Sequence, residues 1–137
     1  MRVLAVDPGD KRLGIALSDP SGRIANPLTV LAHESRAADA ECIARIAREQ
    51  EAGLIVIGQP FGSDGPEAVQ ARKAARLAAA LRSATKIPVR LWDESGSTAA
   101  AREAQIAIGT PSRKRRGHLD DLAATVILQS YLDAHPQ

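Results

Sequence analysis

The chain is predicted to fold as an α/β protein with a five-stranded mixed sheet flanked by helices. Three short strand-like runs come first, separated only by turns. Connections this short can join only antiparallel strands, because parallel strands need a longer crossover. The rest of the chain alternates helix-like and strand-like segments, which is the pattern of crossovers to parallel strands. We therefore expect a three-strand antiparallel meander followed by two parallel strands.

The three meander strands are predicted from short apolar and alternating runs. Residues 3–6 are fully apolar and end at Asp7, directly before a Pro-Gly turn. Residues 13–17 alternate large aliphatic residues with Gly and Ala, which indicates a second strand. Residues 24–31 can form a third strand. Pro27 predicts that this strand lies at an edge or contains a bulge, since proline cannot donate a ladder hydrogen bond.

Apolar periodicity and helix-ending residues define the remaining elements. Gly53 is expected to end the first helix. A basic loop over residues 109–117 is expected to precede the last helix. In chain order the predicted elements are helix 37–52, strand 54–57, helix 66–84, strand 88–92, helix 97–108 and helix 119–134.

Length and composition predict one globular domain over residues 1–137. Apolar residues make up 45% and charged residues 25% of the chain, the balance of a folded protein rather than a disordered one. Cys42 is the single cysteine, which excludes an internal disulfide and fits a reducing compartment. Its thiol is expected to be buried and inert. With no apolar run approaching the ~18 residues of a membrane span and no signal-peptide pattern, we expect a cytoplasmic protein without membrane contact.

Acidic residues close two of the predicted strands. In open α/β sheets, ligands bind beyond the carboxyl ends of the parallel strands, where Asp7 and the pair Asp93-Glu94 lie. Successive strand residues point to opposite faces, so only one acid of that pair can join Asp7. Spacing alone does not choose between them. The alternative for Asp7 is a purely local role, accepting hydrogen bonds from turn amides.

Asp120 is the third candidate acid. On the final helix it is in phase with an apolar stripe that includes Ala124 and Leu128, whereas Asp121 is in phase with Thr125 and Gln129, a stripe expected to face water. A carboxylate at the head of a buried stripe lies at the sheet rim and needs a partner, because burying an unpaired charge costs several kcal/mol. Helix capping is the alternative.

Three such carboxylates without cysteine or histidine form a hard oxygen site. This donor set suits Mg²⁺ or Mn²⁺ rather than Zn²⁺. Two such ions can activate water and stabilise the leaving oxygen in phosphodiester cleavage. The pattern therefore predicts a metal-dependent nuclease, built from Asp7, Asp120 and one acid of the Asp93-Glu94 pair.

Basic residues beside these acids are candidate phosphate ligands. Lys11 and Arg12 lie in the predicted hairpin turn, and Arg113, Lys114, Arg115 and Arg116 lie in the predicted loop 109–117. Plain solvent exposure is the alternative for both groups, and the preferred interpretation of the cations on helix 66–84. Because aromatics make up only 2% of the chain, base stacking can add little affinity. We expect salt-dependent binding through phosphates, and recognition of a structured RNA or a branched DNA by shape.

The chain also resembles the YqgF-type family, which is similar to Holliday junction resolvases and is described as pre-16S rRNA nucleases. The likeness runs from Val3 to about Leu132. Its four motifs, in family order, are residues 7–16 (Asp-Pro-Gly-Asp-Lys-Arg-Leu-Gly-Ile-Ala), Gly58-Gln59-Pro60 with Asp64-Gly65, Asp93-Glu94, and residues 119–124 (Leu-Asp-Asp-Leu-Ala-Ala) continuing to Tyr131-Leu132. The family's arginine after the glutamate is Ser95 here, and its next hydrophobic residue is Gly96.

The resemblance implies a ribonuclease H-like fold and assigns the catalytic and metal-binding positions to Asp7, Glu94 and Asp120. It thereby prefers Glu94 over Asp93. It also implies 5′-end processing of pre-16S rRNA during ribosome biogenesis, with a ribosomal precursor as partner. A structure-selective DNA nuclease and a non-catalytic nucleic-acid-binding factor are the alternatives. Either a monomer or a homodimer is compatible with the sequence.

Overall fold

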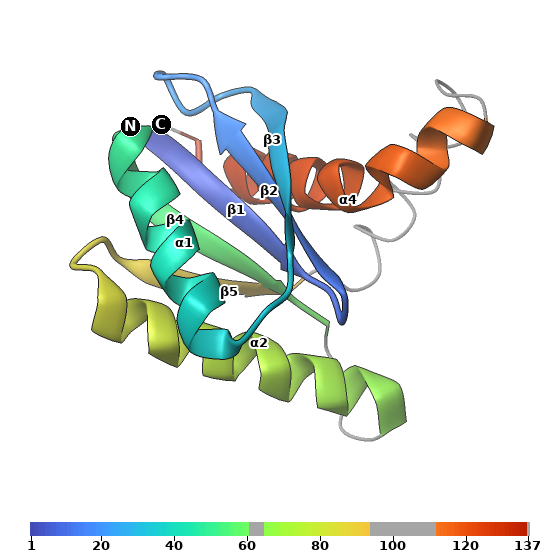
Figure 1. The fold of residues 1–137 in the computed structure, drawn as a ribbon. Coiled ribbons are helices and arrows are strands. Elements are labelled where there is room, and N and C mark those ends of the chain that lie inside the picture. The colour runs from blue at the N-terminus through green and yellow to red at the C-terminus, as the bar shows by residue number, and fades with distance from the viewer. Residues whose placement is uncertain (61–64, 94–111, 137) are drawn as a thin grey trace.

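The fold is a five-stranded mixed sheet with helices on both faces (Figure 1). The computed structural model describes residues 1–60, 65–93 and 112–136, without the side chains of residues 66–67 and 112–121. The predicted fold class is confirmed. The strand order is β3 (Ala25–Ala32), β2 (Arg12–Ser18), β1 (Arg2–Pro8), β4 (Ala52–Gln59) and β5 (Val89–Asp93).

Strand directions follow the predicted meander and crossovers. β1 pairs antiparallel with β2 and β2 with β3, whereas β4 pairs parallel with both β1 and β5. Pro27 lies in β3, which forms one edge of the sheet. The register between β2 and β3 also shifts there, since Ile15 pairs with Thr29 but Ala16 pairs with Pro27. Both features predicted from Pro27, an edge strand and a bulge, are therefore present.

The two faces of the sheet bury alternate residues of each strand. Leu4 and Val6 of β1 pack in the core under α1 (Arg36–Glu49) and α2 (Gly65–Ala84). Val3 and Ala5 pack on the opposite face, against α4 (Ser112–Ala134). This alternation fixes the face toward which each residue at the end of a strand projects.

The last helix begins earlier than predicted. α4 starts at Ser112, so residues 112–117, predicted as loop, are helical, and the expected start at residue 119 is wrong. Arginine and lysine are good helix formers, and one glycine, Gly117, costs only about 1 kcal/mol within a helix. The predicted helix over residues 97–108 lies outside the described residues.

Two further predictions concerning α1 are wrong. The helix ends at Glu49, and Glu51 rather than Gly53 adopts the left-handed conformation, with φ 58°. Gly53 instead belongs to β4, where a Cβ would lie 2.5 Å from Cγ of Met1. Cys42 is only partly buried, and its Sγ lies 3.6 Å from Nη2 of Arg45.

The polar stripe predicted to face water on α4 is instead used in packing. Thr125 is buried, at 9% exposure. Gln129 accepts a hydrogen bond from the Ala25 amide at 2.9 Å and donates one to the Arg23 carbonyl at 3.0 Å. The reason is that α4 lies across β1, β2 and β3. The sheet therefore covers not only the apolar stripe of the helix but also the polar residues beside it.

Candidate active site

Asp7 lies at the carboxyl end of β1, the central strand of the sheet. It continues the alternation of Val3 and Ala5 and therefore belongs to the face covered by α4. Val6 pairs with Ile57, which brings the end of β4 beside it. Asp7 is partly buried and opens onto a hollow of about 280 Å³ lined by residues 7–10, Gly58, Pro60 and Gln70.

A tight turn after Asp7 shapes this hollow. The Gly9 amide donates to the Arg12 carbonyl at 2.9 Å. A Cβ at position 9 would lie 2.5 Å from that oxygen, closer than any side chain tolerates, so the turn requires glycine. The result is a short hairpin whose tip projects beyond the ends of β1 and β2.

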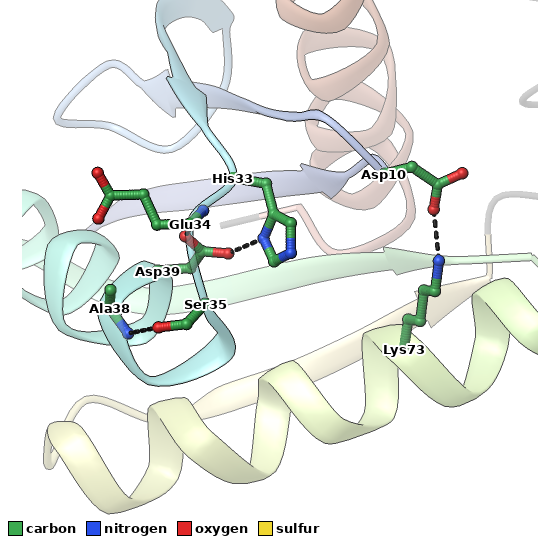
Figure 2. Close-up of polar contacts among 7 residues, drawn as sticks. All are labelled: Asp10, His33, Glu34, Ser35, Ala38, Asp39 and Lys73. Atoms are coloured by element: carbon green, nitrogen blue, oxygen red, sulfur yellow. Dashed lines mark hydrogen bonds and ion pairs between the residues drawn. The ribbon is translucent and has the colours of Figure 1, made fainter.

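Asp10, at the hairpin tip, is tied to α2. Its Oδ1 lies 2.5 Å from Nζ of Lys73 (Figure 2). The same oxygen accepts a hydrogen bond from Nε2 of Gln70 at 3.2 Å. The hydrogen bond from Lys73, followed by that from Gln70, lowers the pKa of the Asp10 carboxyl below its usual value. These contacts hold the tip of the hairpin against the helix that follows β4.

The structure separates Asp93 from Asp7. Val89 and Leu91 of β5 belong to the core under α1 and α2, and Asp93 continues this phase. Trp92, with the opposite phase, donates from Nε1 to the Ser130 hydroxyl of α4 at 3.2 Å. Asp93 therefore lies on the face opposite Asp7, as the sequence reasoning required of one acid of the pair. Glu94 lies outside the described residues.

Asp120 belongs to α4, but its side chain lies outside the described part of the chain. The apolar stripe on which its position was predicted does pack on the sheet, through Ala124, Leu128 and Tyr131. Tyr131 lies beside Met1 and Gly53, where β1 and β4 begin. The C-terminal half of the helix is thus anchored at the rim opposite Asp7.

The predicted basic residues occupy two elements. Lys11 and Arg12 are exposed at the hairpin beside Asp7, and the Lys11 carbonyl accepts a hydrogen bond from the His33 amide at 2.9 Å. Residues 113–116 lie in the first turns of α4, with side chains outside the described set. Because helical residues are rotated by about 100° from one to the next, four consecutive cations cannot share one face. The prediction of a loop carrying them is corrected accordingly.

One pair, His33 and Asp39, was missed by the sequence analysis, which singled out neither residue. His33 is 43% exposed, and its Nδ1 lies 2.5 Å from Oδ2 of Asp39, which is only 5% exposed. Asp39 Oδ1 also accepts from the Glu34 amide at 3.1 Å. The spacing of Asp39 could have indicated this pair, because Asp39 lies one helical turn before the buried Ile43 and therefore on the buried side of α1. A buried carboxylate needs a partner.

Among the side chains that the structure describes, no three His, Cys, Asp or Glu residues gather closely enough to hold a metal ion. Two of the three predicted ligands, Glu94 and Asp120, fall outside that set. In the same part of the chain, no helix is long and apolar enough to cross a membrane.

The architecture is that of the junction-resolving nucleases. The chain is similar to Thermus thermophilus RuvC solved with a Holliday junction substrate, with a TM-score of 0.61, 18% identity, and coverage of 99% of this chain and 96% of that one. It is likewise similar to the fowlpox virus resolvase solved with Holliday junction DNA, with a TM-score of 0.59, 15% identity and full coverage of both chains. Identities this low show a shared fold, the RuvC-like ribonuclease H fold.

Sequence comparison places the chain within one family. The model of the RuvX family, described as Holliday junction resolvase, matches residues 1–134. A protein of Syntrophus aciditrophicus (strain SB) is 46% identical over 137 residues, covering 100% of this chain and 91% of the relative. One of Anaeromyxobacter sp. (strain Fw109-5) is 44% identical over 133 residues, covering 97% of each. Both are named "Putative pre-16S rRNA nuclease". The chain belongs to the RuvX family, also called YqgF, and the predicted family is confirmed.

Proposed function

We propose that this protein is a metal-dependent nuclease that hydrolyses phosphodiester bonds of precursor 16S rRNA, in 5′-end processing during ribosome biogenesis in the cytoplasm. The observation that carries the proposal is Asp7, a partly buried carboxylate at the end of the central strand that opens onto a hollow of about 280 Å³. The RNA substrate rests on the name carried by the relatives at 46% and 44% identity.

Glu94 and Asp120 are the proposed partners of Asp7. Asp93 lies on the face of the sheet opposite Asp7. Since successive residues of an extended strand alternate between the two faces, the next residue, Glu94, would lie on the same face as Asp7. From Tyr131 back to Asp120 the helix rises about 16 Å at 1.5 Å per residue. From Val3 to Asp7 the strand advances about 13 Å. These similar lengths support Asp120 as a residue level with Asp7, at the opposite rim from Tyr131.

An all-carboxylate set fits Mg²⁺ or Mn²⁺, which prefer oxygen ligands. A bound divalent ion would lower the pKa of an attacking water and stabilise negative charge on the phosphate. The chain's own residues supply position and charge. The glycine turn and the Asp10–Lys73 contact hold the hairpin in place, and Lys11 and Arg12 offer cations to the phosphates of a strand that enters beside Asp7.

The direct test compares two aspartates on opposite faces of the sheet. Asp7→Asn keeps the shape of the side chain and removes its charge. We expect it to reduce cleavage of a precursor 16S rRNA fragment about a hundredfold or more. The reason is that each ~1.36 kcal/mol of lost transition-state stabilisation lowers the rate tenfold, and a metal ligand contributes several kcal/mol. Asp93→Asn is the matched control and should retain activity. Both variants are checked for folding by circular dichroism. If Asp7→Asn cleaves as fast as the parent protein, the site lies elsewhere.

A junction-resolving DNA nuclease is the second candidate, favoured by the description of the family model that matches residues 1–134. It would use the same acids. Offering a four-way DNA junction in the same assay separates the two, and symmetric cutting of a junction would require a two-fold dimer. Binding without cleavage of either substrate, in Mg²⁺ and in Mn²⁺, would instead indicate a non-catalytic nucleic-acid-binding factor.

A further inference from the structure

A second hollow, of about 190 Å³, lies on the other side of the hairpin tip from Asp7. Its lining includes His33 from the segment between β3 and α1, Arg36 from the start of α1 and Lys73 from α2. Residues 8–10 line this hollow and also the one at Asp7. The hairpin tip is therefore a shared wall between the proposed active site and a neighbouring hollow that carries three basic side chains.

The imidazole of His33 is held in a fixed orientation. Asp39 is buried and receives both the His33 ring and the Glu34 amide, so its two oxygens are engaged. Figure 2 shows Nε2 of His33 on the side away from Asp39, toward Asp10 and Lys73. When both ring nitrogens carry protons, Nδ1 donates to Asp39, and Nε2 can donate to an anion in the hollow.

Arg36 and the start of α1 favour an anion in the hollow. The two carboxylates of the hollow already have partners, Asp39 in His33 and Asp10 in Lys73. Lys73 is therefore not counted toward the anion. Arg36 makes no ion pair with any residue in the described ranges. The first turn of α1, capped by Ser35, begins at the same place and adds the positive end of its dipole.

We infer that this hollow binds a phosphate group of the nucleic-acid strand that is cleaved at Asp7, next to the scissile bond. A strand that passes around the hairpin tip would present successive phosphates to the two hollows. Arg36 then supplies a cation and the His33 ring a second contact, and Asp39 is a positioning residue that orients His33. This inference rests on the proposed nuclease function and specifies how that site holds its substrate.

Inorganic phosphate, added without divalent ions, tests the hollow independently of cleavage. The side-chain ¹⁵N resonances of His33 are followed by NMR during the titration. We expect a saturable shift in the parent protein that is strongly weakened in Arg36→Gln. Arg36 is exposed, so this variant should fold. Arg45→Gln, an exposed change elsewhere on α1, is the control and should titrate as the parent does. If the His33 ¹⁵N chemical shifts do not change when phosphate is added, the inference is overturned.

RNA binding and cleavage give the second readout. The double variant His33→Gln/Arg36→Gln should bind a precursor 16S rRNA fragment about tenfold more weakly in Ca²⁺. The slope of log affinity against log salt should fall by about 0.7 for the lost single-strand phosphate contact. In Mg²⁺ its KM should rise while kcat stays close to that of the parent. Affinity and slope equal to those of the parent would contradict the inference while leaving Asp7-dependent cleavage intact. If phosphate shifts the His33 resonances but no cleavage depends on Asp7, the proposed function is contradicted and the phosphate site is not.

Discussion

Individual acids of this protein are distinguished by the face of the sheet they occupy. Asp7 shares the α4 face with Val3 and Ala5, and Asp93 takes the phase of Val89 on the other face. Asp39 is buried on α1 and is matched by His33. Among the acids whose side chains the structure describes, Asp7 alone combines a strand end on the α4 face with partial burial and a hollow beside it, which is why the proposed chemistry is assigned to it.

Asp19 illustrates a carboxylate used for structure rather than chemistry. The Ser21 hydroxyl, then the amides of Ile24 and Arg23, hydrogen-bond to it and lower its pKa far below the usual 3.8. A lowered pKa stabilises the fold above the ordinary pKa, and this contribution is lost as pH falls through the native value. Asp19→Ala should therefore lower Tm at neutral pH, and the two melting curves should converge in strong acid. A Tm difference that is constant over the whole pH range would contradict this role.

At the residue scale, sequence reasoning succeeded where phase decides the answer. The apolar run over residues 3–6 predicted Asp7 at a strand end, and two-residue alternation required that only one acid of the Asp93-Glu94 pair share its face, without saying which. The ties of Asp10 to Gln70 and Lys73 join residues 60 and 63 positions apart. Such contacts depend on how α2 docks beside the hairpin, and no local pattern encodes that docking. The roles of Glu94 and Asp120 remain predictions, since their side chains fall outside the described set.

Helices and strands could be predicted from the sequence where the spacing of apolar residues and the positions of turn residues indicate the same element. All five strands were identified, because each is a short aliphatic run bounded by turns. The start of α4 was missed because a basic run was taken to indicate a loop, although Arg and Lys favour helix. The environment of Thr125 and Gln129 was missed because a polar stripe can also pack against a sheet when its groups find hydrogen-bond partners.

Gln129 offers a test of how α4 is anchored. Replacing it with alanine removes the acceptor for the Ala25 amide and the donor to the Arg23 carbonyl. Loss of these contacts should reduce the free energy of unfolding by roughly 1 kcal/mol, measured by urea denaturation. Asp133→Ala removes only the contact from Gln129 within the helix and should have a smaller effect. If Gln129→Ala is as stable as the parent protein, the Gln129 side chain does not anchor α4 and faces water as the sequence predicted.

At the scale of the whole molecule, the two rims of the sheet have different compositions. One rim carries Asp7, the hairpin tip and the hollows described above. At the other, Tyr131 stacks on His135, with ring centroids 4.2 Å apart, and contacts Trp92 edge-on. Figure 1 places both chain ends at that second rim. The proposed ligand site thus lies at the rim opposite this aromatic cluster.

The basic start of α4 should contribute to nucleic-acid binding from the ligand rim. Changing Arg113, Lys114, Arg115 and Arg116 to glutamine should weaken binding of precursor rRNA and flatten its salt dependence. Because consecutive positions on a helix are rotated by about 100°, only part of the set can face one ligand. We expect the salt slope to fall by about 0.7 to 1.4, the effect of one or two single-strand phosphate contacts. An unchanged slope, with helix content preserved, would exclude this segment from binding.

Bound Mn²⁺ broadens the NMR resonances of nearby amides, so a manganese titration can locate the proposed ion site. We expect the amides of Gly9, Gly14 and Gly58, around Asp7, to broaden first, while those of Gly22 and Gly53 at the opposite rim stay sharp. Asp7→Asn should abolish this pattern. Equal broadening at both rims, or a pattern unchanged in Asp7→Asn, would contradict a divalent-ion site at the end of β1.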